Sequence, residues 1–349
     1  MLIIIGVLLF ELIVLIHEGG HFVAAKLSGV KVNEFALGMG PKLFSFTKGE
    51  TKYSLRLLPI GGYCSMEGED EESDNPRAFG NKPVWKRIII VVAGAVMNII
   101  LGLLMTLTMV LQQPYYASTT VSVFAENAVT SDYIQVGDKL EEIDGYPIWN
   151  SMDIAFALGT CKNYEPNIKV NRNGQSIDLG NVPLYTYDNN GETTIARDFY
   201  VEPVEKNFLS VCGETIGQTV STVRMVYASL VGLVTGKFGF NEMSGPVGVA
   251  SAITTVASQG LESSFLDAFN NILYIMMILT INLGIFNLLP VPALDGGRLL
   301  FLLIELVRRK PVPQKYEGVI HGIGFALLMV FMLAVTFNDI VRVFTGGFG

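Results

Sequence analysis

Two of the chain's three histidines, His17 and His21, lie four residues apart in an apolar stretch that covers residues 1–27. On a helix, residues with this spacing share one face, so both imidazoles can bind the same metal ion. Glu18 would point to the side, where it could hold and deprotonate water rather than bind the metal. The spacing is that of the helical zinc-hydrolase motif, and it predicts His17 and His21 as zinc ligands and Glu18 as the catalytic base. The alternative is a set of buried polar residues in a helix bundle, which is disfavoured because unpaired ionisable groups in lipid are costly.

Two residues could supply the third ligand of such a site. Asp295 follows Pro290 and Pro292, which must break the helix of a later apolar stretch. Irregular backbone at membrane depth is tolerated where it is buried in protein or lines a wet cavity, so Asp295 could reach the metal. Asp295 could equally be a capping residue before a turn. His321 is the rival third ligand, and it stands alone at the start of the last apolar stretch.

The composition is that of a membrane protein. Half of the residues are hydrophobic and 16% are charged, whereas soluble domains carry about 25% charged residues. The net charge is −8 and no basic stripe is present, which argues against nucleic acid as a partner. The three cysteines form neither a disulfide framework nor a zinc-type pair.

Four apolar stretches approach the ~20 residues needed to cross a bilayer. They predict a polytopic α-helical membrane protein with about four transmembrane helices, at residues 2–25, 88–111, 272–289 and 320–343. The first stretch lacks the basic start of a signal peptide, so we expect it to be retained. Ten Lys or Arg residues lie between the first two stretches and five between the last two, which predicts that both loops are cytoplasmic. The long segment between the second and third stretches is then extracytoplasmic, and the two histidines lie toward the cytoplasmic side.

The extracytoplasmic segment carries the turn signals of a β-rich domain. Strong hairpin signals stand at Asp144-Gly145, Asn173-Gly174 and Asn190-Gly191. The pattern over residues 128–148 resembles a PDZ domain of the circularly permuted bacterial type. Such a domain can bind an extended peptide along a sheet edge, or it can block access by its bulk, and both alternatives stay open. The predicted domains are the N-terminal membrane half, the PDZ-like domain and the C-terminal membrane half, at residues 1–112, 113–205 and 206–349.

Three separated motifs in the chain resemble those of the site-2 protease family (peptidase family M50), in its bacterial regulator-of-sigma-E (RseP-type) branch. They are residues 17–21, residues 77–98 and residues 287–297. The resemblance implies an intramembrane zinc metalloendopeptidase with His17, His21 and Asp295 as Zn²⁺ ligands and Glu18 as base. It also implies that Asn282 and Asn287 help to hold the substrate backbone, although these amides could instead tie helices together. Only one PDZ-like domain is present, where some members of the family carry two.

A transmembrane substrate must unwind before its peptide bonds can be cut, and an exposed strand edge would help. Residues 43–47 and 53–58 read as a membrane-associated β-hairpin that could add the unwound substrate as a strand. The hairpin could instead simply pack on the first span. Gly19 and Gly20 each cost a helix about 1 kcal/mol relative to Ala, which is tolerable if they let a neighbouring helix or the substrate come close.

The leading hypothesis is regulated intramembrane proteolysis in the bacterial cell membrane. The enzyme would cut a single-span membrane protein, such as an anti-sigma factor or a remnant signal peptide, after a first cut outside the membrane. The PDZ-like domain would act as a size filter, and membrane lipid would surround the protease core. Two other classes of protein remain open at this stage: a membrane zinc transporter or sensor, and a non-proteolytic PDZ scaffold.

Overall fold

The computed structural model describes residues 2–69, 71–161, 164–189, 192–239, 243 and 245–345. The chain divides into two compact units. The membrane unit comprises Met1–Met105 and Val231–Gly349, and the β-rich unit comprises Thr106–Leu230. The β-rich unit therefore includes most of the helix that follows the sheet, which the sequence-based division at residue 205 assigns to the C-terminal membrane half.

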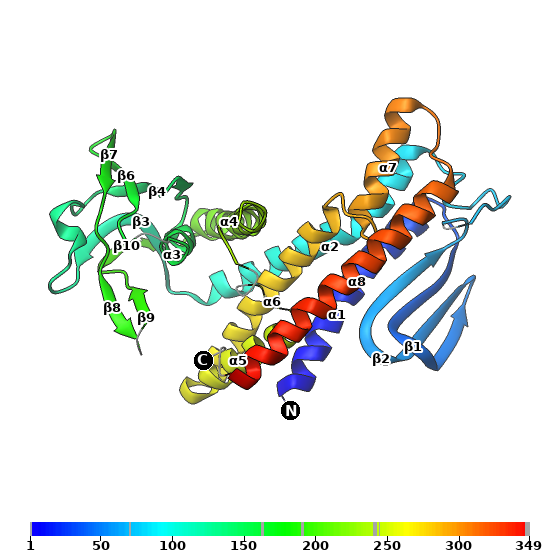
Figure 1. Cartoon of the computed structure of the whole chain (residues 1–349), viewed down its shortest axis with the longest axis horizontal. Coiled ribbons are helices and arrows are strands. Elements are labelled where there is room, and N and C mark those ends of the chain that lie inside the picture. Colours follow the sequence, from blue (N-terminus) through cyan, green and yellow to red (C-terminus); the bar gives the residue numbers. More distant parts are fainter. Residues whose placement is uncertain are drawn as a thin grey trace. The chain divides into compact units, whose positions relative to one another are not determined.

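Long apolar helices dominate the membrane unit (Figure 1). They are α1 (Leu2–Leu27), α2 (Val84–Gln112), α6 (Phe265–Leu288) and α8 (Gln314–Thr345). Two shorter helices accompany them, α5 (Pro246–Ser263) and α7 (Asp295–Arg308). Over the described residues, four helices are long and apolar enough to cross a membrane: Gly6–Leu27, Val84–Gln112, Phe265–Leu288 and Lys315–Arg342. The predicted four spans are thus confirmed by length and composition.

The exposed surface of α8 agrees with a lipid environment. Its side chains Leu327, Val330 and Leu333 are each about two-thirds exposed, at 67%, 66% and 65%. A contiguous apolar surface of this kind marks a contact with membrane or protein. Together with the four apolar helices and the β-rich unit, it identifies a membrane protein that carries a β domain.

Small residues bring the helices close together. A Cβ atom on Gly20 of α1 would lie 2.5 Å from the carbonyl oxygen of Ala93 in α2, and one on Gly102 of α2 would lie 2.4 Å from the Ile281 side chain in α6. Glycine at such crossings lets backbones approach within contact distance. Helix packing at Gly20 is therefore confirmed, whereas a Cβ at Gly19 would meet no described atom within 4 Å.

A small sheet lies beside α1 in the membrane unit (Figure 1). It is built from β1 (Val32–Lys48) and β2 (Thr51–Met66), and both of these long strands change partner along their length. The segment 42–48 pairs with 51–56, which confirms the predicted hairpin. The segment 32–39 lies between 51–58 and 62–66, so 62–66 forms an additional strand of the sheet that the sequence does not predict.

The β-rich unit contains short antiparallel strands around its own core. Its main sheet has the order β10-β3-β4-β6-β7, with β5 paired to β4, and a separate hairpin joins β8 to β9. The strands are β3 (Tyr115–Phe124), β4 (Lys139–Ile143), β5 (Tyr146–Pro147), β6 (Asn167–Arg172), β7 (Gln175–Asn181), β8 (Thr186–Asn189), β9 (Glu192–Ile195) and β10 (Phe199–Glu205). The core includes the fully buried Val121, Ile134, Leu140, Ile154 and Val170.

Tight turns connect β4 to β5 and β6 to β7, as the sequence predicts. Asp144-Gly145 and Asn173-Gly174 all have positive φ angles, between 49° and 84°, as two-residue hairpins of type I′ require. The third predicted turn, Asn190-Gly191, lies outside the described residues.

The helix α4 (Phe208–Val234) is fastened to the β-rich unit by buried polar contacts. Arg224 lies 3.2 Å from the completely buried Asp153 of α3 (Ser151–Gly159), and its guanidinium stacks 3.7 Å over the ring of Trp149. Ser221 donates to the same Asp153 carboxylate. Because a buried charge must be paired, α4 completes this unit rather than merely adjoining it.

Candidate metal centre

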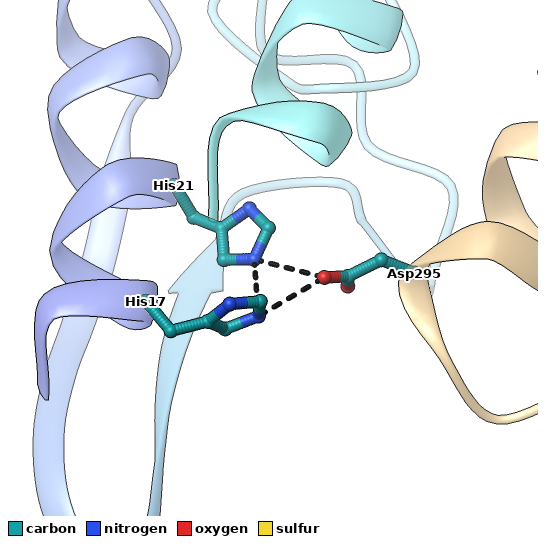
Figure 2. A group of neighbouring side chains, drawn as sticks. All are labelled: His17, His21 and Asp295. Atoms are coloured by element: carbon teal, nitrogen blue, oxygen red, sulfur yellow. Dashed lines mark hydrogen bonds and ion pairs between the residues drawn. The ribbon is translucent and has the colours of Figure 1, made fainter. Parts of the chain in front are cut away.

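Three side chains from two distant helices converge in the membrane unit. His17 and His21 project from one face of α1, and Asp295 is the first residue of α7 (Figure 2). Asp295 Oδ2 lies 3.1 Å from His17 Nε2 and 3.2 Å from His21 Nε2, and the two Nε2 atoms are 3.2 Å apart. Both imidazoles are buried and the carboxylate is about one-quarter exposed. These are the three residues for which the sequence suggests a metal site.

The break that the sequence predicts at Pro290 and Pro292 is confirmed, and it delivers Asp295. The helix α6 ends at Leu288 and α7 begins at Asp295. Without this break, a continuous helix would carry Asp295 further along the axis of α6. The irregular segment therefore turns the chain so that the carboxylate faces the α1 histidines.

The contacts of His21 direct its Nε2 atom at Asp295. The carbonyl oxygen of Ile90 in α2 lies 2.8 Å from His21 Nδ1, and a carbonyl can only accept, so Nδ1 carries the proton. In neutral imidazole, Nε2 is then an acceptor. An acceptor that faces a carboxylate oxygen at 3.2 Å is unfavourable unless a proton or a metal ion lies between them.

His17 has a comparable outer partner in α2. Asn98 is completely buried, and its Nδ2 lies 3.3 Å from His17 Nδ1, while its Oδ1 has no hydrogen-bond partner among the described residues. Rotating this amide by 180° exchanges oxygen and nitrogen, so that His17 Nδ1–H can donate to Oδ1. Metal-binding histidines characteristically have an outer hydrogen-bond partner of this kind.

Gly94 of α2 makes room for the two imidazoles, a role that sequence reasoning did not assign. A Cβ atom at this position would lie 2.4 Å from His21 Nε2 and 2.7 Å from His17 Cε1. Any larger residue would therefore occupy the space in which the ligand atoms meet. Only its place in the motif 77–98 could have drawn attention to it.

Glu18 faces the additional strand 62–66 of the sheet. The backbone of Cys64 lies against its carboxyl group, and a Cβ atom on Gly62 would be 3.4 Å from Glu18 Cγ. The glycine at position 62 thus lets the strand pass close to Glu18. The hairpin that the sequence predicts, 43–47 with 53–58, forms the other side of the sheet.

The two asparagines of α6 occupy different surroundings. Asn287 Nδ2 lies 3.4 Å from His17 Nε2, at the edge of the three-residue cluster. Asn282 is half-buried five residues earlier on α6. Five residues correspond to a rotation of about 140° around a helix, so the two amides cannot point in the same direction.

His321, the rival third ligand, lies on α8 and binds backbone instead. Its Nδ1 accepts a hydrogen bond of 2.9 Å from the N–H of Ala293, in the break between α6 and α7. The cluster of potential metal ligands found over the described residues contains Asp295 and not His321.

The donor set fits zinc. Two imidazole nitrogens and a carboxylate oxygen are ligands that Zn²⁺ prefers, and three protein ligands leave a fourth position for water or substrate. A tetrahedral ion about 2.0 Å from each ligand would separate the ligand atoms by about 3.3 Å. The observed separations of 3.1–3.2 Å are close to that value.

Apolar helices that enclose two imidazoles and a carboxylate are the features of a membrane protein with a candidate metal centre. The sequence profile of peptidase family M50 matches residues 5–331 of the chain, which therefore belongs to that family and is a metalloprotease.

Relatives cover nearly the full chain. One from Clostridium acetobutylicum is 36% identical over 345 aligned residues, which cover 97% of both chains, and its name places it provisionally among zinc metalloproteases. The regulator of sigma-W protease RasP of Bacillus subtilis is 31% identical, covering 97% of this chain and 98% of its own length. The zinc metalloprotease RasP of Geobacillus kaustophilus is 32% identical, covering 97% of both. The names of the Clostridium acetobutylicum and Geobacillus kaustophilus relatives give zinc as the metal.

Proposed function

We propose that this metalloprotease cleaves the transmembrane segments of single-span membrane proteins, with the α1–α7 cluster as its zinc site. The observation that carries the proposal is the convergence of His17, His21 and Asp295 within 3.2 Å among helices that are apolar enough to span a membrane. Ionisable groups within membrane-spanning segments are costly and usually functional, which supports a catalytic role for this cluster.

Each residue of the cluster has a role in this proposal. His17, His21 and Asp295 hold the ion, and Ile90 O and Asn98 orient the imidazoles. When bound, zinc supplies a Lewis acid that activates water and polarises the scissile carbonyl. Glu18 accepts the proton of the attacking water at its carboxylate and returns it to the leaving amine.

The strand segment 62–66 is the proposed binding site of the unwound substrate. Within the described chain its only strand partner is 32–37, and it passes directly beside Glu18. On its other side the backbone of Cys64 contacts the Glu18 carboxylate and the N–H of Met66 donates to Glu69, so a substrate strand would replace these side-chain contacts. An extended peptide that adds to this edge would satisfy its backbone hydrogen bonds while lying next to the catalytic base. The segment 62–66 thus replaces the predicted hairpin of residues 43–47 and 53–58 as the favoured acceptor of the substrate strand.

The asparagines have a secondary part in the proposal. Asn287, at the edge of the ligand cluster, can donate to a substrate carbonyl near the scissile bond. Asn282 belongs to a different face of α6, so it would contact a more distant part of the substrate or a neighbouring helix.

The proposed topology follows from the basic loops, which favour a cytoplasmic position for residues 26–87 and 298–315. The β-rich unit is then extracytoplasmic, where it would act as a PDZ-like size filter. The name of the Bacillus subtilis relative, regulator of sigma-W protease, supports an anti-sigma factor as one substrate class. Remnant signal peptides are a second class with the same single-span architecture.

Substitution of Glu18 by Gln tests the proposal. The variant is reconstituted in lipid vesicles with a tagged single-span substrate, and cleavage and bound zinc are measured together. Loss of the base should lower the cleavage rate by about 10²–10⁴-fold, while zinc stays bound because Glu18 is not a ligand. Undiminished cleavage would contradict the assignment, and zinc flux across the vesicles would indicate a transporter.

The size filter is tested on the intact enzyme with two substrates that differ only in the length of their extracytoplasmic domain. The shortened substrate should be cleaved faster. Equal cleavage of both substrates would remove the filtering role from the β-rich unit.

A further inference from the structure

The segment between α6 and α7 contains an unusual tight turn. The N–H of Leu294 donates to the carbonyl of Val291 over 3.2 Å, with Pro292 and Ala293 as the two central residues. The φ angle of Ala293 is +79°. Proline at the second position and a positive φ at the third are the features of a type II turn, which normally requires glycine at the third position. Alanine disfavours this conformation, so something else must stabilise it.

A side chain from α8 provides the compensation. Type I and type II turns differ in the central peptide, because ψ of the second residue changes from about −30° to about +120°. That rotation reverses the direction of the Ala293 N–H. In the observed turn this N–H donates to His321 Nδ1 over 2.9 Å, and in a type I turn it would point away from His321. The imidazole therefore selects the type II form.

The packing of α8 brings His321 to this position. Gly324 lies one turn further along α8, where a Cβ atom would be 2.3 Å from Cβ of Pro292 and 2.8 Å from its carbonyl oxygen. The His321 ring also packs against Phe301 of α7, with 5.7 Å between ring centroids. The helix thus presses directly on the turn, and the imidazole is held between the turn and α7.

This type II turn also fixes the start of α7. Leu294 is the N-cap residue, and the N–H of Gly297 donates to its carbonyl oxygen over 3.0 Å. A Cβ on Gly296 would lie 2.0 Å from the carbonyl oxygen of Leu289, so the preceding loop wraps tightly around the first turn of the helix. Asp295, the first residue of α7, has little freedom to move independently of the turn.

We propose that His321 is a positioning residue for Asp295. By accepting the Ala293 N–H, it stabilises the turn that holds the Asp295 carboxylate against His17 and His21. The imidazole itself does not touch the metal. This inference rests on the proposed function in one respect, that Asp295 is a zinc ligand.

The central test measures the zinc affinity of the purified full-length chain by competition with a chelator. His321→Leu removes the acceptor, and loss of an outer partner typically lowers metal affinity about 10–100-fold. His321→Asn restores an acceptor, because its Oδ1 occupies nearly the position of Nδ1, so its affinity should lie closer to that of the unchanged chain. Phe301→Leu is the matched control: it removes the ring contact, keeps the acceptor and should have little effect.

A second substitution tests the turn directly. Ala293→Gly makes the positive φ favourable without help from His321, so in the His321→Leu background it should recover most of the lost zinc affinity. By itself, Ala293→Gly should change affinity little. If His321 only stabilised the packing of α8, a change in the turn would not restore the zinc affinity. Recovery of zinc affinity in the double variant would also show that the chain still folds.

Two results would overturn the proposal: zinc affinity unchanged in His321→Leu, or no recovery on adding Ala293→Gly. Asp295→Asn separates the two levels of inference. If Asp295→Asn retains full zinc affinity, the ligand assignment itself fails. If Asp295→Asn loses zinc but His321→Leu does not, the ligand assignment stands and only the positioning role is wrong.

Discussion

The proposed metal centre combines two regions that present their ligands in opposite ways. On α1, the helix itself sets the relation between His17 and His21, because residues four apart share a face. At the α6–α7 break, the position of Asp295 depends on a turn, on glycines without room for a side chain and on a contact from α8. A regular element therefore needs little support to place a ligand, whereas an irregular one depends on several other segments.

The largest effect should come from filling the space where both regions meet. Gly94→Ala would place a Cβ atom 2.4 Å from His21 Nε2. Because this atom displaces the imidazoles themselves, the loss of zinc affinity should exceed the roughly 100-fold upper value for an outer partner. Competition with a chelator measures the zinc affinity of this variant. Normal zinc binding in Gly94→Ala would mean that α2 does not approach α1 as described.

The next effect should come from the break. Gly296→Ala would place a Cβ atom 2.0 Å from the carbonyl oxygen of Leu289, so the loop must shift and carry Asp295 with it. We expect a loss of zinc affinity of about 10–100-fold, the range typical of changes to groups that support a metal ligand. Gly322→Ala on α8 is the control, since no described atom lies within 4 Å of its Cβ position. Equal behaviour of the two variants would break the proposed contrast between regions.

A smaller effect is expected from the outer partner of His17. Asn98→Leu keeps a side chain of similar size but removes the hydrogen bond to Nδ1, and zinc affinity should fall about 10-fold. Thr280→Val is the control, because it removes a bond to the Asn98 backbone and leaves the amide in place. If both variants bind zinc equally, the α1 side needs no support from Asn98.

The smallest effect on zinc should come from Gly19→Ala. No described atom lies within 4 Å of the Cβ position, and the change removes a helix cost of about 1 kcal/mol. Zinc affinity should be unchanged. Cleavage of a transmembrane substrate, measured in parallel, would fall only if the substrate backbone passes close to this position. The result therefore shows whether the substrate contacts α1 at Gly19.

The same contrast explains what the sequence can predict. His17, Glu18 and His21 follow from spacing alone, and the break before Asp295 follows from two prolines, because both signals are local. The role of Gly94 depends on how closely α2 approaches α1. The proposed role of the segment 62–66 depends on the way β2 continues past its hairpin to pair with residues 32–37. The hydrogen bond from Ala293 to His321 joins residues 28 positions apart through a turn type that alanine normally disfavours. None of these has a local signature.

The attachment of α4 has a consequence for cooperativity in the β-rich unit. Asp153 is completely buried, and Arg224 of α4 is its ionic partner. Removing one partner of a buried ion pair typically costs about 3–5 kcal/mol, a large share of the stability of a small domain. Sheet and helix should therefore behave as one foldon, whose amides lose exchange protection together. A fragment that ends at residue 205 would leave the buried Asp153 carboxylate without its ionic partner. A version of this unit that folds by itself must therefore extend beyond Arg224.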